Sequence, residues 1–284
     1  GVAVLKADDP LTAAMAPHCP GAIVFFCLDG LHPVIVEHRS RGGRVVFVRD
    51  NSVVLAEGDL EFPLLSLDRI PLTHKGRILF QVENVLSSTA ANWALGIPAE
   101  VIRNGLETFS SSVDKSPGRF NLLEINGATV VVDYGHNTSS LQAMLQTLAL
   151  FPHKRRLAVY SAAGDRRDID MVQQGEMLGQ AFDRVILYED QYMRGREPGE
   201  IMALFQQGLK AGGRVTDIVP VQGWNKAVDD VLLWVQPGDL VLLQADTIDE
   251  AVNVVKQLMA TDAQTREVNL KEALRTASDS TPKL

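Results

Sequence analysis

The chain has 284 residues, of which 46% are hydrophobic and 22% are charged, and its formal net charge is −8. This length favours two domains, because single domains usually span about 100–200 residues. The negative balance argues against nucleic acid as a partner, although a local basic patch can still bind a small anionic ligand.

No segment of the sequence suits a membrane span or a metal site. The longest apolar run, Ala22 to Leu28, is much shorter than the roughly 20 residues that cross a bilayer, and the first residues do not resemble a signal peptide. We therefore expect a cytoplasmic protein without a membrane partner. The two cysteines, Cys19 and Cys27, lack metal-ligand spacing and lie in or beside apolar stretches, so we interpret both as core residues.

The first part of the chain alternates between strand and helix patterns. In chain order we predict a strand at 2–7, a helix at 9–17, a strand at 21–28, a helix at 33–41, a hairpin at 44–55 turning at Asp50-Asn51, and helices at 81–95 and 98–109. The opening run Gly1 to Leu5 is typical of a buried central strand, and it lacks a starting Met. We therefore expect the chain to begin partway along a longer polypeptide.

A polar stretch at 110–118 predicts a hinge between two domains. After it, the pattern predicts a hairpin at 120–133 turning at Asn126-Gly127, a helix at 138–151, and strands at 157–162, 185–188, 217–221 and 240–244. Strands separated by amphipathic helices indicate a parallel sheet covered on both faces. In such sheets ligands bind beyond the carboxyl ends of the strands.

Charged and polar residues follow three of these predicted strands. The three clusters are Asp133 to Asn137, Gly164 to Asp168, and Glu189-Asp190 with the nearby run Arg194 to Arg196. Because parallel strands end at the same edge of a sheet, we expect the clusters to form one site rather than three solvated loops.

These residues resemble motifs of the Mur ligase superfamily. Asp133 to Asn137 is similar to the Asp-Tyr-Ala-His signature of the C-terminal domain, Ser116 to Phe120 to the arginine motif that opens it, Gly76 to Asn84 to an adenine-binding helix start, and Ala7 to Pro10 to an Asn-Ala-Asp-Asp strand end. Within the superfamily, Ala163 to Asp168 and Tyr188 to Glu200 resemble the cyanophycin synthetases rather than the muropeptide ligases. The resemblance extends over about residues 1–258.

The resemblance implies an α/β fold with two domains. Residues 1–112 would be the C-terminal portion of a Mur-type central, ATP-binding domain, residues 113–264 a Rossmann-like Mur ligase C-terminal domain, and residues 265–284 a polar tail. Lys6 departs from the family, which usually has Asn there, and Thr138 stands where many members have Pro.

The resemblance also implies roles for individual residues. ATP would be bound by Asn84, Arg119, Asp133 and His136, the catalytic group would be His136, Asp165 and Arg166, and the incoming amino acid would contact Glu189, Asp190, Arg194 and Arg196. These residue types suit the roles: a guanidinium fork binds phosphate oxygens, an amide offers adenine both a donor and an acceptor, and a pair of carboxylates can receive a guanidinium.

The reaction implied is ATP-dependent addition of arginine to the aspartate side-chain carboxylate of a cyanophycin chain, through an acyl phosphate. No Gly-x-x-x-x-Gly-Lys-Thr/Ser loop occurs in the sequence, and the family's Mg²⁺ ligands would precede residue 1. We therefore expect this chain to be inactive alone and to act with the rest of a full-length, homo-oligomeric synthetase. The alternatives are another Mur-type amino-acid ligase and a non-catalytic Mur-like scaffold in a synthetase that polymerises dipeptides.

Overall fold

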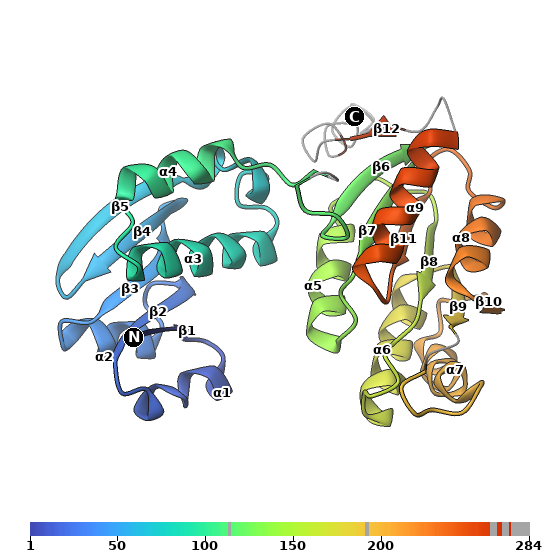
Figure 1. Ribbon diagram of the computed structural model, residues 1–284, viewed down its shortest axis with the longest axis horizontal. Coiled ribbons are helices and arrows are strands. Elements are labelled where there is room, and N and C mark those ends of the chain that lie inside the picture. Colours follow the sequence, from blue (N-terminus) through green and yellow to red (C-terminus); the bar gives the residue numbers. More distant parts are fainter. Residues whose placement is uncertain (113–114, 191–192, 262–265, 269–272, 274–284) are drawn as a thin grey trace, which may run out of the picture. The chain divides into compact units, whose positions relative to one another are not determined.

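The computed structural model describes residues 1–112, 115–190, 193–261, 266–268 and 273. The chain divides into two compact units, Gly1–Ser110 and Ser111–Leu284 (Figure 1). Each unit is built on its own sheet and has its own hydrophobic core. Among the described residues, no helix is long and apolar enough to cross a membrane.

The first unit contains a five-stranded sheet in the order β1-β2-β3-β4-β5. Its elements are β1 (Val2–Lys6), α1 (Pro10–Ala13), a 3₁₀ turn (Ala16–His18), β2 (Ala22–Asp29), α2 (Pro33–Ser40), β3 (Arg44–Arg49), β4 (Ser52–Glu57), β5 (Leu60–Ser66), 3₁₀ turns at Leu67–Arg69 and Pro71–Thr73, α3 (Leu79–Ala94) and α4 (Ala99–Thr108). Strands β1, β2 and β3 are parallel, and β3, β4 and β5 are antiparallel.

Two features of this unit differ from the sequence-based expectation. The predicted helix at 9–17 is only one turn of α1 followed by a 3₁₀ turn, because Pro17 has no N–H to continue the α-helical hydrogen bonds. Strand β5 was not predicted. Its run contains Pro63, which has no N–H to donate, and β5 accordingly lies at the edge of the sheet, where such a residue is tolerated.

The second unit contains a seven-stranded sheet in the order β10-β9-β8-β11-β7-β6-β12. Its elements are β6 (Asn121–Ile125), β7 (Ala128–Asp133), α5 (Thr138–Leu148), β8 (Arg156–Tyr160), α6 (Asp168–Ala181), β9 (Arg184–Glu189), α7 (Glu200–Gly212), β10 (Asp217–Gln222), α8 (Trp224–Leu232), β11 (Leu240–Gln244), α9 (Ile248–Thr261) and β12 (Arg266–Glu267). The five strands from β10 to β7 are parallel, whereas β6 and β12 are antiparallel additions at one edge.

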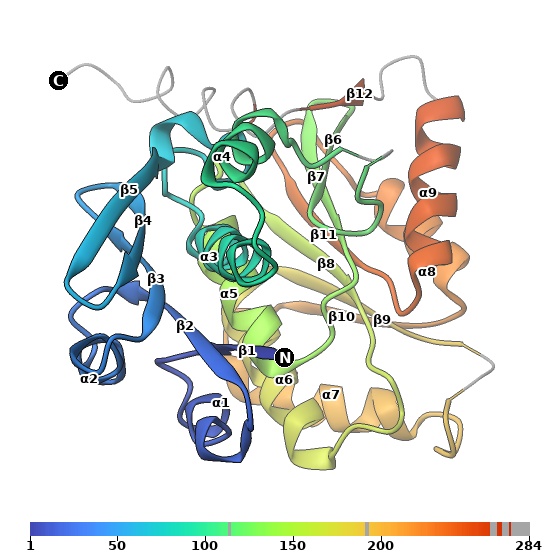
Figure 2. The same cartoon turned by 60° about the vertical axis from the view of Figure 1, so that its left-hand side comes forward.

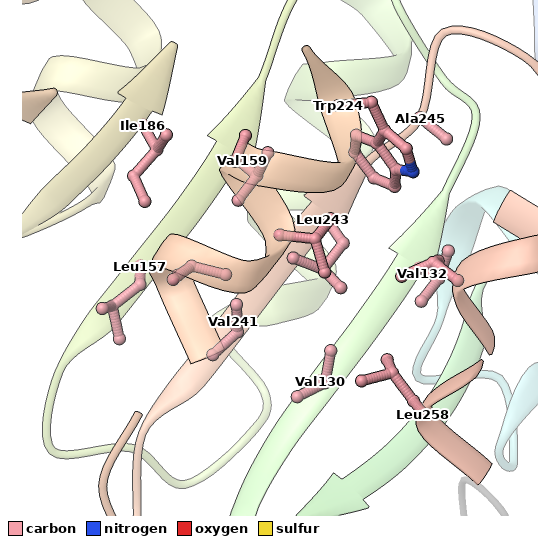
Figure 3. Packing of buried hydrophobic residues seen from close by; sticks show 14 of the residues in the cluster. Val130, Val132, Leu157, Val159, Ile186, Trp224, Val241, Leu243, Ala245 and Leu258 are labelled. Atoms are coloured by element: carbon pink, nitrogen blue, oxygen red, sulfur yellow. The ribbon is translucent and has the colours of Figure 1, made fainter. Parts of the chain in front are cut away.

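Helices cover both faces of this sheet, as predicted. Tyr160 of β8 contacts Gln174 of α6 and Phe205 of α7 on one face. Its neighbour Val159 points to the other face and belongs to the core formed with α8 and α9, because successive strand residues alternate between faces (Figure 3). Figures 1 and 2 show α5 and α6 on the side of the sheet opposite α8 and α9.

The strand order creates two switch points that chain order alone does not reveal. Strand β11 is inserted between β7 and β8, although it follows β10 in the sequence. The chain leaves β7 and β8 toward the face of α5 and α6 but leaves β11 toward the face of α9 (Figure 1). On each side of β11, the loops after neighbouring strands therefore turn toward opposite faces of the sheet. Ligands of open α/β sheets bind at such switch points.

The predicted polar tail, residues 265–284, lies mostly outside the described residues. Of those that are described, Arg266 and Glu267 form β12, which pairs antiparallel with β6. The next residue, Val268, is buried and donates its N–H to Leu122 O. This part of the tail therefore belongs to the sheet.

Candidate functional site

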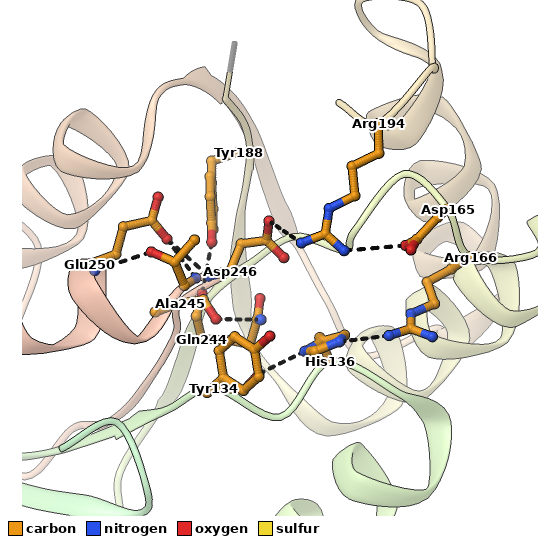
Figure 4. Close-up of polar contacts among 11 residues, drawn as sticks. Tyr134, His136, Asp165, Arg166, Tyr188, Arg194, Gln244, Ala245, Asp246 and Glu250 are labelled. Atoms are coloured by element: carbon orange, nitrogen blue, oxygen red, sulfur yellow. Dashed lines mark hydrogen bonds and ion pairs between the residues drawn. The ribbon is translucent and has the colours of Figure 1, made fainter. Parts of the chain in front are cut away.

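The structure brings the three predicted clusters of the second unit to one edge of its sheet (Figure 4). Asp133 ends β7, the loop bearing Asp165 and Arg166 follows β8, and Glu189 ends β9. A fourth strand, β11, ends among them at Gln244. The parallel direction of these strands places their carboxyl ends side by side.

Asp133 is held by backbone hydrogen bonds on both carboxylate oxygens. The Phe120 N–H donates to Oδ2 over 2.9 Å, and the Gly135 N–H donates to Oδ1 over 2.6 Å. Burial raises the pKa of Asp133 above its usual value, although these bonds and the charge of Arg119 favour the carboxylate. Each oxygen still has lone-pair capacity for a further donor, such as a ribose hydroxyl.

His136 and Arg166 form a direct hydrogen bond across two loops. The Arg166 Nη2 lies 2.8 Å from Nε2 of His136, while Nδ1 of His136 lies 3.0 Å from the carbonyl oxygen of Tyr134. The carbonyl can only accept, so Nδ1 carries the proton and Nε2 accepts from the guanidinium. The buried Nε of Arg166 has no hydrogen-bond partner in the structure.

Arg119 is exposed, and its guanidinium lies over the ring of Tyr134, which also contacts His136. Its Cζ lies 4.9 Å from the centroid of the Tyr134 ring, the distance of a cation–π contact. Within the described ranges, no carboxylate forms an ion pair with Arg119. Its planar set of N–H donors thus fits phosphate oxygens.

Glu189 and Arg196, both predicted to contact the incoming amino acid, form hydrogen bonds between neighbouring loops. Glu189 is 1% exposed and accepts hydrogen bonds from the N–H groups of Gly199 and Met202 at 2.8 and 3.0 Å. Arg196 donates to the carbonyl oxygens of Gly164 and Arg166 at 2.9 and 2.7 Å. Its guanidinium also pairs with Asp168 and Glu200.

The other two residues predicted to contact the amino acid are Asp190 and Arg194. Asp190 belongs, with Asp246 and Glu250, to a cluster of carboxylates that we call the acidic group. Asp190 Oδ1 accepts from the Trp224 N–H at 3.1 Å, but its Oδ2 is buried without a partner among the described residues. Arg194 bridges two loops, with Nη1 3.5 Å from Asp165 and Nη2 3.8 Å from Asp246 (Figure 4). These long distances leave the Arg194 guanidinium weakly held.

Sequence reasoning missed Asp246 and Glu250, which follow β11. Asp246 Oδ1 is buried and has no hydrogen-bond partner in the part of the chain that the structure describes. Burial raises the pKa of Glu250, and the negative charges of Asp190 and Asp246 raise it further. The strand-end rule applied to the predicted strand 240–244 would have found both residues. Among the described residues, no group of three or more His, Cys, Asp and Glu side chains has a geometry suited to a metal ion.

Asn84, the predicted adenine contact, lies on α3 of the first unit. Its Nδ2 donates to Oε1 of Gln81 over 3.1 Å. The neighbouring Glu83 forms a 2.7 Å ion pair with Lys6, the residue that departs from the family pattern at the end of β1. The Lys6 ammonium is therefore already paired with Glu83 within the first unit.

The fold and the site define the class of protein. Residues 118–247 match the family described as the Mur ligase, glutamate ligase domain. The solved structure "E.coli FolC in complex with DHPP and ADP" has a TM-score of 0.56 at 16% identity, covering 84% of this chain and 54% of that chain. A murein peptide ligase structure from Psychrobacter arcticus has a TM-score of 0.54 at 12% identity, covering 86% and 53%. Residues 118–247 therefore form a domain of the Mur ligase family.

Within that family the chain is similar to cyanophycin synthetases. The enzyme of that name from Synechocystis sp. is 33% identical over 260 residues, which are 90% of this chain and 29% of the relative. A diaminopimelate-adding muropeptide ligase from Alkaliphilus metalliredigens is 25% identical over 242 residues, 84% of this chain and 45% of that relative. This chain thus spans less than a third of the length of the cyanophycin synthetases that it matches.

Proposed function

We propose that this chain is part of an ATP-dependent ligase that joins arginine to the side-chain carboxylate of an aspartate in a cyanophycin chain. The observation that carries the proposal is that Arg119, Asp133 and the His136–Arg166 pair all lie around the carboxyl end of β7, where Tyr134 contacts both Arg119 and His136. The similarity to cyanophycin synthetases supports this substrate class. The chain itself contains no phosphate loop, so the phosphoryl-transfer machinery has to be completed elsewhere in the full-length protein.

The residues suit the charge changes of such a reaction. The γ-phosphoryl group of ATP passes to the aspartate carboxylate, releasing ADP, and the arginine amine then displaces phosphate to leave an amide. Asp133 would bind the ribose, and Arg119 would bind phosphate oxygens. Arg166, oriented by its bond to His136, would stabilise the negative charge that develops during transfer. Mg²⁺ would be held outside this chain.

The acidic group would select a cationic amino acid. Within the described part of the chain, Asp190 and Asp246 each have a buried oxygen without a partner. Glu250, whose Oε2 accepts from the N–H groups of Asp246 and Thr247, lies beside them. A guanidinium carries five donors and a delocalised charge, so it suits several carboxylates at once. Because Glu189 is occupied by backbone N–H groups, Asp190 is the member of the predicted pair that remains for this role.

Phosphate release tests the proposal. In the full-length protein we expect release that requires ATP, arginine and a β-aspartyl acceptor polymer together, and in this chain alone no release above a no-protein control. Arginine-independent release, or release with glutamate or diaminopimelate in place of arginine, would indicate another Mur-type ligase. If the full-length protein polymerises a preformed dipeptide but never adds free arginine, this region is a scaffold.

A further inference from the structure

We propose that Tyr134 is a positioning residue for nucleotide binding: its ring holds Arg119, and it also holds His136, the residue that orients Arg166. The inference rests on the proposed function, because that function assigns Arg119 to phosphate oxygens and Arg166, which His136 orients, to the charge that develops during transfer. Tyr134 follows Asp133 directly, and its own N–H donates to Gly118 O over 3.0 Å. This bond fixes the ring beside the segment that carries Arg119.

One ring contacts both Arg119 and His136. The Arg119 Cζ lies over it at 4.9 Å from the centroid. The His136 ring meets it nearly at right angles, with centroids 4.8 Å apart and an interplanar angle of 80°. Tyr134 therefore contacts two side chains from different loops, Arg119 before β6 and His136 after β7.

The kind of contact explains why an aromatic residue suits this place. A carboxylate partner would neutralise Arg119 and occupy its N–H donors. An aromatic face attracts the guanidinium through the charge distribution of the ring and leaves those donors free for phosphate oxygens. Holding a long side chain before the ligand arrives also reduces the rotamer entropy that binding would otherwise remove.

The contact with His136 also supports a positioning role for Tyr134. The Tyr134 carbonyl accepts from Nδ1 of His136, which leaves Nε2 to accept from Arg166. The perpendicular ring contact restrains the plane of the imidazole. A change of the Tyr134 side chain leaves the carbonyl in place, so it tests the ring alone.

The test is an ADP titration of the 284-residue chain followed by NMR, which measures millimolar affinities. The variants are Tyr134→Phe, Tyr134→Leu, Arg119→Ala and the double variant Tyr134→Leu/Arg119→Ala. We expect Tyr134→Leu to weaken ADP binding about fivefold, and Tyr134→Phe, which keeps the ring, less than about twofold. Because Tyr134 acts through Arg119, the double variant should lose clearly less than the product of the two single losses.

A spectroscopic signature separates positioning from packing. In the unaltered chain and in Tyr134→Phe, ring current should shift the side-chain protons of Arg119 upfield, and Tyr134→Leu should abolish that shift while the chain stays folded by circular dichroism. Full ADP affinity in Tyr134→Leu beside weakened binding in Arg119→Ala would overturn the role of Tyr134 alone. Strictly multiplicative losses would also overturn it. No ADP binding to the unaltered chain, or none lost in Arg119→Ala, would count against the proposed function itself.

Discussion

Arg166 donates from Nη2 to Nε2 of His136 over 2.8 Å, which links the loops after β8 and β7. We expect Arg166→Ala to weaken nucleotide use in the full-length protein about tenfold to a hundredfold, because hydrogen bonds that involve a charged group contribute about 1.5–3 kcal/mol. The matched control is Arg167→Ala, since Arg167 is exposed and pairs with Asp170 within its own helix. Equal ATP titration curves for both variants would remove Arg166 from the site.

Asp133→Ala should lower both the free energy of unfolding of the chain and its affinity for nucleotide. Its carboxylate is the acceptor for the N–H groups of Phe120 and Gly135, and an alanine leaves both donors unpaired. A buried donor without a partner costs about 1–3 kcal/mol, so the urea midpoint of the variant should fall measurably. Asp133→Asn, which keeps one acceptor, should fall less. A stable Asp133→Ala variant that binds ADP normally would show that Asp133 has neither role.

The acidic group should set the choice of amino acid. In the double variant Asp190→Asn/Asp246→Asn we expect the apparent KM for arginine to rise at least about tenfold while the KM for ATP changes little, because the charge that selects a guanidinium is removed. Lysine should already be a poorer substrate than arginine, since it lacks the planar fork. The control is Asp249→Asn on the exposed start of α9. Undiminished discrimination between arginine and citrulline in the double variant would place arginine recognition elsewhere.

Helices α6 and α7 pack at close range through glycines. The glycines without room for a side chain are Gly175 and Gly179 on α6 and Gly208 and Gly212 on α7. A Cβ at Gly208 would lie 2.0 Å from the carbonyl oxygen of Val172, so the helices would have to separate. We expect Gly208→Ala to destabilise the chain by about 1–3 kcal/mol in urea unfolding, as overpacking does. Gly105→Ala is the control, because open space surrounds Gly105 on α4 and alanine favours a helix. Equal effects of the two changes would contradict the close packing.

Asp183 should make stability depend on pH in the acid range. Burial disfavours its charge, but a bidentate pair with Arg214 and the Arg156 N–H outweigh that effect and lower the pKa of Asp183 below 3.8. Its contribution is therefore complete above pH 3.8 and is lost as the pH falls through the lowered value. The difference in melting temperature between the unaltered chain and Asp183→Asn should shrink between about pH 5 and pH 2. A difference that stays constant over this range would exclude a charged pair.

The sequence by itself determined most of the elements, the class of fold and three of the polar clusters at the strand ends. Alternation of helix and strand patterns predicted the parallel sheet, and the motif around Asp133 and His136 predicted the Mur ligase fold that the comparisons confirm. Such patterns are local, because they depend on side-chain periodicity and on short runs of residues. The roles of the individual site residues remain predictions.

Only the tertiary structure decided which of those residues are free to act. Glu189 and Asp190 are adjacent in the sequence, yet Glu189 is satisfied by the N–H groups at the start of α7, and Asp190 keeps a buried oxygen without a partner. The insertion of β11 between β7 and β8 brings Asp246 and Glu250 beside Asp190, although a long stretch of chain separates them. Strand order and hydrogen-bond partners are long-range properties, so no local pattern encodes them, and they determine which charges remain available to a ligand.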